Sequence, residues 1–197
     1  MKDIGLLAVL FGSIFTNNIL LTNYLGMCSF LAISRDVKAS IGLGTAVTFT
    51  MAVTSVLNWL VYYLVLVPLG VEYLSFIVFI VVIAAFVQVV EMVIERVSET
   101  LYVALGVFLP LITVNCAILG ACLFMIIRTY GLMASFFYGL GSGLGWALAI
   151  LVMAGIRQKM AARSNVPKGL EGAGITLIVA GIMALAFMGF NGMINLN

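Results

Sequence analysis

The chain has 197 residues, of which 64% are hydrophobic, 8% are charged and none is histidine. A soluble domain carries roughly 25% charged residues, so this composition excludes an ordinary soluble protein and places the chain in a lipid bilayer. The lack of histidine excludes a His-centred catalytic triad, and a net charge of +2 gives no basis for binding nucleic acid.

Charged residues divide the apolar sequence into six segments, each long enough to cross a hydrocarbon core of roughly 30 Å as a helix. We therefore predict an all-α membrane protein with a single integral membrane domain, residues 1–197. The predicted spans are Ile4–Ile33, Ser40–Val67, Tyr73–Ile94, Leu101–Ile127, Leu132–Ile156 and Gly172–Leu196. The polar loops are Ser34–Lys38, Arg96–Thr100 and Arg157–Glu171.

The basic residues predict how the spans are oriented. Six spans put both termini on one side, and most basic residues then lie on the other side, which should be cytoplasmic. Both termini are therefore expected outside. The cytoplasmic group is Arg35, Lys38, Arg96, Arg157, Lys159, Arg163 and Lys168, whereas Lys2 and Arg128 lie outside.

Two short internal matches suggest a repeat. Leu25–Phe30 matches Leu119–Phe124 at an offset of 94, and Gly42–Thr45 matches Gly139–Ser142 at an offset of 97. The repeat halves are then about 1–100 and 101–197. With three spans in each half, the halves must have opposite topology, which predicts a 3+3 inverted repeat of the kind common in membrane transport proteins.

The first and fourth spans contain polar and helix-breaking residues where hydrocarbon should lie. Interrupted helices survive in a membrane only where protein buries them or where they line a cavity. Paired interruptions therefore predict half-helices at a functional site, although polar side chains also act simply as hydrogen-bonding links between helices. The residues are Thr16, Asn17, Asn18, Thr22, Asn23 and Gly26 in the first span, and Pro110, Thr113, Asn115 and Cys116 in the fourth.

All three cysteines lie in these two spans. Cysteine is often a small buried hydrophobe, but thiolates beside interrupted helices also suit soft metals and iron–sulfur clusters. The chain cannot supply the usual four thiolates of such a cluster, so a partner would have to supply the rest. The repeat matches Cys28 with Cys122, whereas Cys28 and Cys116 have similar polar or helix-breaking neighbours. The residues alone do not decide which of the two cysteines acts together with Cys28.

Two further features are candidates for function. Glu91 lies about one turn deeper in the third span than Glu95, and a carboxylate within the membrane is a candidate ion path. The alternative is that both carboxylates lie at the membrane surface. The glycine series of Gly139–Gly145 lies in an apolar span, so it indicates close helix contacts and not a phosphate-binding loop.

Three segments carry a resemblance to a known family. Leu25–Ser34, Leu105–Ile118 and Gly139–Trp146 resemble the NqrE/RnfA family, the membrane subunits of the Na+-pumping NADH:quinone oxidoreductase and of the related Rnf complex. The resemblance extends over nearly the whole chain. Met27–Ala32 looks closer to NqrE, whereas Asn17–Asn18 looks like RnfA.

The resemblance implies six spans with half-helices in the first and fourth, and a homologous partner of opposite topology, of the NqrD or RnfE type. It implies an intramembrane [2Fe–2S] cluster to which each subunit gives two cysteines, here Cys28 and Cys116, with Cys122 left out. FMN, FAD and quinone are then expected on other subunits, and the complex is expected in the bacterial inner membrane.

On this interpretation the chain is not catalytic alone, but carries electrons across the membrane within an Na+-translocating NADH:quinone oxidoreductase. One alternative is the RnfA subunit of a ferredoxin:NAD+ oxidoreductase. A second alternative is an inverted-repeat secondary transporter without a cluster, because transporters also contain broken helices.

Overall fold

The computed structural model describes residues 5–97, 109–163 and 172–190. These residues form helices joined by turns, with no β-strand among them. Within these described ranges, four helical stretches are long and apolar enough to cross a membrane, and two shorter ones lie in the first and sixth predicted spans. The all-α membrane architecture is therefore confirmed. The long stretches are Val37–Leu69, Glu72–Val93, Pro110–Ile127 and Leu132–Ala162, and the short ones are Leu6–Thr16 and Ala173–Met188.

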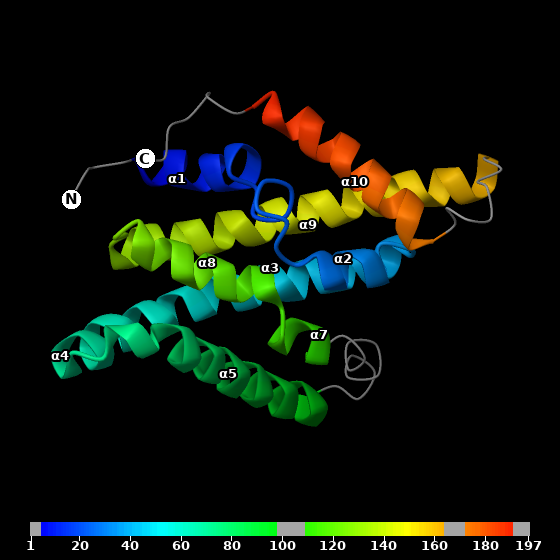
Figure 1. The fold of residues 1–197 in the computed structure, drawn as a ribbon. Coiled ribbons are helices and arrows are strands. Elements are labelled where there is room, and N and C mark those ends of the chain that lie inside the picture. Colours follow the sequence, from blue (N-terminus) through cyan, green and yellow to red (C-terminus); the bar gives the residue numbers. More distant parts are fainter. Residues whose placement is uncertain (1–4, 98–108, 164–171, 191–197) are drawn as a thin grey trace.

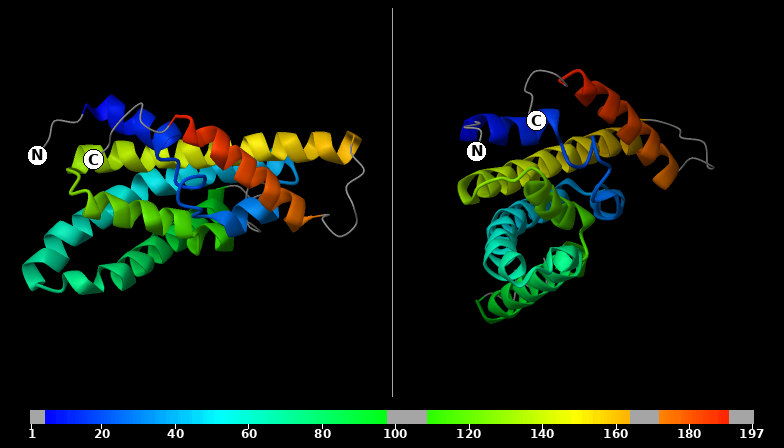
Figure 2. Two further views of the ribbon diagram at one scale, coloured as in Figure 1. Left: turned by 45° about the horizontal axis from the view of Figure 1, so that its top comes forward. Right: turned by 60° about the vertical axis from the view of Figure 1, so that its left-hand side comes forward.

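The helices run back and forth along one common direction (Figures 1 and 2). In chain order they are α1 (Leu6–Phe11), the π-helical η1 (Gly12–Thr16), α2 (Met27–Ile33), α3 (Val37–Val61), the π-helical η2 (Tyr62–Leu66), α4 (Val67–Leu69), the 3₁₀ turn η3 (Glu72–Leu74), α5 (Ser75–Val97), α7 (Leu109–Thr113), α8 (Cys116–Ile127), α9 (Leu132–Arg163) and α10 (Ala173–Met188).

The first and fourth predicted spans are both broken. The first consists of α1 and η1, then a non-helical segment, then α2, and the described part of the fourth consists of α7 and α8. From the middle of the bundle, α2 and α8 run toward opposite ends (Figure 1). Opposite directions are what an inverted repeat requires.

The described basic residues lie at the ends of the bundle. The turn that holds Arg35 and the ends of α5 and α9 lie at one end, and the turn after α8 that holds Arg128 lies at the other (Figure 1). This is the division that the alternating spans predict. Lys2 and Lys168 lie outside the described residues.

Several boundaries differ from the sequence prediction. α5 continues to Val97, past the predicted Ile94, and α10 ends at Met188, before the predicted Leu196. Two further differences have a clear local cause. The fifth predicted span ends at Ile156, with a loop from Arg157, but α9 continues to Arg163. Lys, Gln, Met, Ala and Arg are all good helix formers, so the helix continues after the apolar stretch ends. The second span begins at Val37, earlier than expected, because the Asp36 carboxylate caps α3 by accepting the Lys38 backbone N–H at 3.1 Å.

The long helices α3 and α9 form the centre of the bundle. Glycines of α9 allow its backbone to approach both α3 and α1 closely. A Cβ at Gly143 would lie 2.6 Å from the Thr48 Cα on α3, and one at Gly141 would lie 2.8 Å from the Leu10 carbonyl oxygen on α1. The glycine series of α9 is therefore a surface for close helix contacts, as predicted.

We expect Gly143→Ala to lower the free energy of unfolding by about 1–3 kcal/mol, because the new methyl would push against the α3 backbone. Gly155→Ala is the matched control on the same helix, since nothing lies within 4 Å of a Cβ there. That change should be neutral or should stabilise by up to about 1 kcal/mol. Thermal unfolding in nanodiscs measures both, and equal melting temperatures would contradict this packing.

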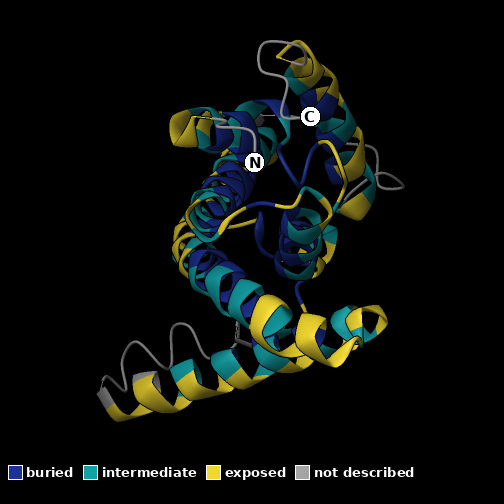
Figure 3. Ribbon diagram, turned by 90° about the vertical axis from the view of Figure 1, so that its left-hand side faces the viewer, coloured by how far each residue is buried: buried dark blue, intermediate teal, exposed yellow. Residues whose placement is uncertain are grey.

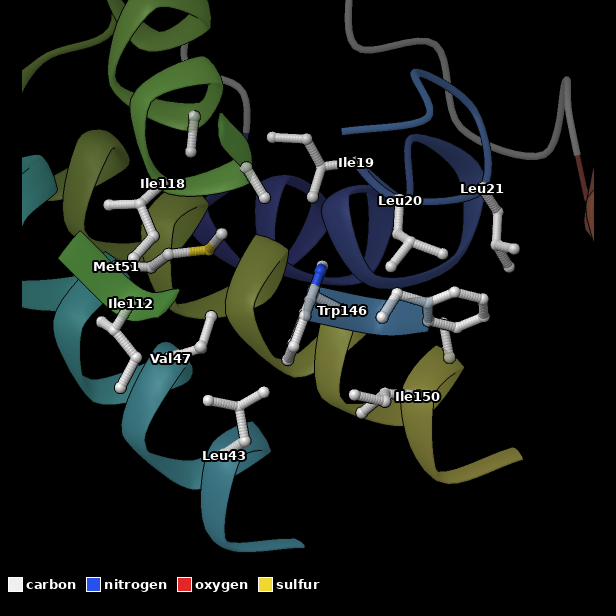
Figure 4. Close-up of a cluster of buried hydrophobic side chains, with 14 of the residues drawn as sticks. Ile19, Leu20, Leu21, Leu43, Val47, Met51, Ile112, Ile118, Trp146 and Ile150 are labelled. Carbon is white, nitrogen blue, oxygen red and sulfur yellow. The ribbon is translucent and has the colours of Figure 1, made fainter. Parts of the chain in front are cut away.

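Fully buried apolar side chains join the central helices. Leu43, Val47 and Met51 of α3 meet Ile118 of α8 and Ile150 of α9 in one cluster (Figure 4). Outer faces are apolar but exposed, most plainly along α5 (Figure 3). An apolar face of this kind suits lipid or another membrane subunit.

Candidate functional site

Asn18 organises the break in the first span. Its side-chain Nδ2 donates to the carbonyl of Gly145 at 2.8 Å and to that of Ile14 at 3.1 Å. Its Oδ1 accepts from the backbone N–H groups of Leu20 and Leu21 at 3.1 and 3.3 Å. Asn18 is fully buried, so one side chain replaces helical hydrogen bonds and fastens the break to α9.

Gly26 lets the chain start a second helix. It precedes α2 with φ of +83°, a left-handed conformation that favours glycine. Its backbone N–H donates to the Sγ of Cys116 at 2.9 Å, across 90 positions of sequence. The beginning of α2 therefore lies directly against the beginning of α8.

Asn115 plays the corresponding part in the fourth span. Its Oδ1 caps α8 by accepting the Ala117 N–H at 3.0 Å, and its Nδ2 donates to the Ser29 hydroxyl at 3.4 Å. The Ser29 hydroxyl in turn donates to the Gly26 carbonyl at 3.2 Å. These bonds hold the starts of the two half-helices together.

The structure brings Cys28 and Cys116 to this junction. Cys28 is the second residue of α2, two positions after Gly26, and Cys116 is the first residue of α8. Both cysteines are exposed. Gly26 and Asn115 each stand directly before a half-helix.

Cys122 lies apart from the exposed junction. It is fully buried, and the Nδ2 of Asn58 donates to its Sγ at 3.1 Å. Its position in the second turn of α8 makes it a packing residue between α8 and α3. Cys28 and Cys116 both lie in the first turn of a half-helix, whereas Cys122 lies deeper in α8.

The exposed surface around the junction is unusual for a membrane protein. Thr22, Asn23 and Tyr24 of the first break are exposed, and so is Val114 beside the second. Lipid-exposed irregular backbone does not occur within the hydrocarbon region. Irregular backbone at that depth is tolerated only where protein buries it or where it lines a water-filled cavity.

The junction can supply two thiol ligands. Within the described ranges, no three His, Cys, Asp or Glu side chains gather as a metal site. Cys116 is the first residue of α8, and Cys28 is the second residue of α2. Two such sulfurs form half of the ligand set of an iron–sulfur cluster.

Glu91 is not part of this junction. It is half-buried within the last two turns of α5, one turn before the exposed Glu95. Its role as an ion path therefore stays a prediction.

Arg157 is a site residue that sequence reasoning missed. The sequence pattern places it only among the basic loop residues, but its guanidinium Nη1 reaches from α9 to the end of α2. It donates to the Leu31 carbonyl at 3.2 Å and to the Ser34 hydroxyl at 2.7 Å. A cation is favourable at a helix C-terminus, so Arg157 holds the half-helix that carries Cys28.

We expect Arg157→Ala to lower the free energy of unfolding by about 2 kcal/mol, the size of hydrogen bonds to a charged group. The exposed Lys159, two positions along α9, is the control, and Lys159→Ala should leave the melting temperature unchanged. If both variants unfold at the temperature of the unmodified protein, Arg157 does not hold α2.

Trp146 was also missed as a site residue. In the sequence it is only the last residue of the Gly139–Trp146 motif, but its side chain lies fully buried against Gly26. Only the folded arrangement of α9 against the first span makes that contact visible.

Comparison with known proteins shows the family of this chain. The profile of the family described as "Rnf-Nqr subunit, membrane protein" matches residues 6–194. The chain is 52% identical over 190 residues to the NqrE subunit of the Na+-translocating NADH-quinone reductase of Psychromonas ingrahamii, covering 91% of this chain and 94% of that protein. It is 49% identical over 188 residues to the RnfA subunit of the Na+-translocating ferredoxin:NAD+ oxidoreductase complex of Acetobacterium woodii, covering 95% and 97%. The chain therefore belongs to the Rnf-Nqr family of membrane subunits.

Proposed function

We propose that this chain is a membrane subunit of an Na+-translocating NADH:quinone oxidoreductase, and that it carries electrons across the membrane through a shared intramembrane [2Fe–2S] cluster. Cys28 and Cys116 would give two of the four thiolates, and a homologous subunit of opposite topology would give the other two. The observation that carries the proposal is the contact of the Gly26 N–H with the Cys116 sulfur, where two half-helices begin.

The residues of the junction fit an iron–sulfur group. The Gly26 N–H already donates to a sulfur, and N–H···S bonds are among the features that set the potentials of such clusters. The chemistry that the group supplies when bound is one-electron transfer. The chain itself orients the two sulfurs, through Asn115 and Ser29, and presents them on an exposed face.

The position of the junction supports transfer across the membrane. It lies midway along the bundle (Figure 1), and a hydrocarbon core is roughly 30 Å thick. A redox group there divides that distance between two shorter steps. Added negative charge in a medium of low dielectric constant is unfavourable without a compensating cation, which makes the junction a suitable place to couple electron transfer to Na+.

The partner and the membrane orientation are part of the same proposal. A homologous subunit of opposite topology, of the NqrD or RnfE type, would cover the irregular backbone at the junction. FMN, FAD and quinone would belong to other subunits. The complex would lie in the bacterial inner membrane with both termini of this chain outside, because the basic residues gather at the opposite end.

The relative from Acetobacterium woodii favours a second candidate, because that protein, which belongs to a ferredoxin:NAD+ oxidoreductase complex, is 49% identical to this chain. The same junction would then serve a complex with another donor and acceptor. The fold of this subunit would be unchanged.

The test is to purify the complex through a tag on this chain and measure two reactions. NADH-driven quinone reduction with Na+ uptake into vesicles supports the first candidate. Reduction of NAD+ by reduced ferredoxin supports the second. If the chain purifies alone, without iron and without either reaction, both candidates are wrong and a solute transporter is favoured.

A further inference from the structure

The indole of Trp146 presents an unexplained donor. Its side chain is fully buried in α9, yet its Nε1 is one of four buried side-chain atoms, among the described residues, without a hydrogen-bond partner. An indole N–H in an apolar core normally finds an acceptor, because leaving it unpaired is destabilising. The other three atoms are Asn58 Oδ1, Ser135 Oγ and Ser142 Oγ.

This donor lies against the Gly26 turn. A Cβ placed on Gly26 would be 2.6 Å from Trp146 Nε1, 3.0 Å from the Ala117 Cβ and 3.2 Å from the Asn115 Oδ1. Figure 4 shows the indole among the core side chains, with its nitrogen directed toward the first-span segments. The unpaired indole N–H of Trp146 therefore lies next to Gly26, the residue whose backbone N–H contacts the Cys116 sulfur.

We propose that Trp146 is a positioning residue that sets the reduction potential of the group held by Cys28 and Cys116. The indole packs against the Gly26 turn beside Asn115, and the N–H of that turn contacts the Cys116 sulfur. The N–H dipole of Trp146 therefore lies close to the group, whose reduction adds one electron and breaks no bond. Hydrogen-bond donors and fixed dipoles around a metal site stabilise its more negative state. This inference rests on the proposed function.

Trp146→Phe tests the role in the purified complex, reduced stepwise with dithionite and followed by electron paramagnetic resonance. We expect unchanged iron per complex and a lower potential. At the midpoint potential of the unmodified complex, the ratio of reduced to oxidised cluster should fall about tenfold. A tenfold change corresponds to the free energy of one hydrogen bond to a charged group. Trp59→Phe is the matched control, because the Trp59 Nε1 donates to the Tyr130 carbonyl at 2.8 Å. It should leave the potential unchanged.

A second variant separates the donor from the packing. In the Trp59→Phe background, Trp146 is replaced by benzothienylalanine, which has the same ring shape but a sulfur in place of the N–H. We expect the same fall in potential as with phenylalanine. An unchanged potential would overturn the role of the N–H, and so would loss of iron, since the donor would then serve assembly. Absence of iron from the unmodified complex would instead overturn the proposed function.

Discussion

Cys28→Ser and Cys116→Ser should each reduce the iron content of the purified complex to background and abolish its electron transfer. Serine preserves the size of each side chain, but its hydroxyl is not a thiolate, the ligand that holds iron–sulfur clusters. Both residues are exposed at the starts of the half-helices, so neither change disturbs a packed core. The complex should therefore still assemble, with an unchanged set of subunits.

Cys122→Ser provides the matched control within the same chain. Cys122 is buried and accepts a hydrogen bond from Asn58, a bond that a serine hydroxyl can also accept. Iron content and turnover should stay close to those of the unmodified complex. The ligand assignment is wrong if the Cys122 variant loses iron while either of the other variants keeps it.

Gly26→Ala should have the second largest effect, because two penalties coincide at this position. A left-handed conformation disfavours any residue with a Cβ by about 1–2 kcal/mol, and the new methyl would lie 2.6 Å from Trp146 Nε1. Crowding in a packed core adds about 1–3 kcal/mol. We expect unfolding at a lower temperature and a reduced iron content, because the displaced turn draws its N–H away from the Cys116 sulfur.

Gly70→Ala isolates the first of these penalties. Gly70 also has a positive φ, of +66°, but nothing lies within 4 Å of a Cβ there. Thermal unfolding and iron analysis of both variants compare strain alone with strain plus crowding. If Gly26→Ala is no more destabilising than Gly70→Ala, and if the two variant complexes contain the same amount of iron, the close contact with Trp146 contributes to neither stability nor iron binding.

The general architecture was predictable because hydropathy and helix geometry are local properties. Twenty apolar residues cross a membrane wherever they occur, so composition identifies the spans. The breaks were predictable for a similar reason. Asn18, Gly26 and Asn115 are residues whose side chains or backbone favour helix ends, and each of them lies at a break.

The contacts that make the site were not predictable from the sequence. Asn18 bonds to Gly145 across 127 positions, and Gly26 bonds to Cys116 across 90. Nothing local identifies such partners. The internal match at an offset of 94 pairs Cys28 with Cys122, and that register stays a prediction.

Iron and acid-labile sulfide analysis, with electron paramagnetic resonance, tests the central claim most directly when it is made on this chain with and without its partner subunits. We predict one [2Fe–2S] cluster per copy of the chain in the complex and none in the chain alone, because Cys28 and Cys116 are half of the ligand set. An intact, active complex with no iron and sulfide in its membrane subunits would contradict the account.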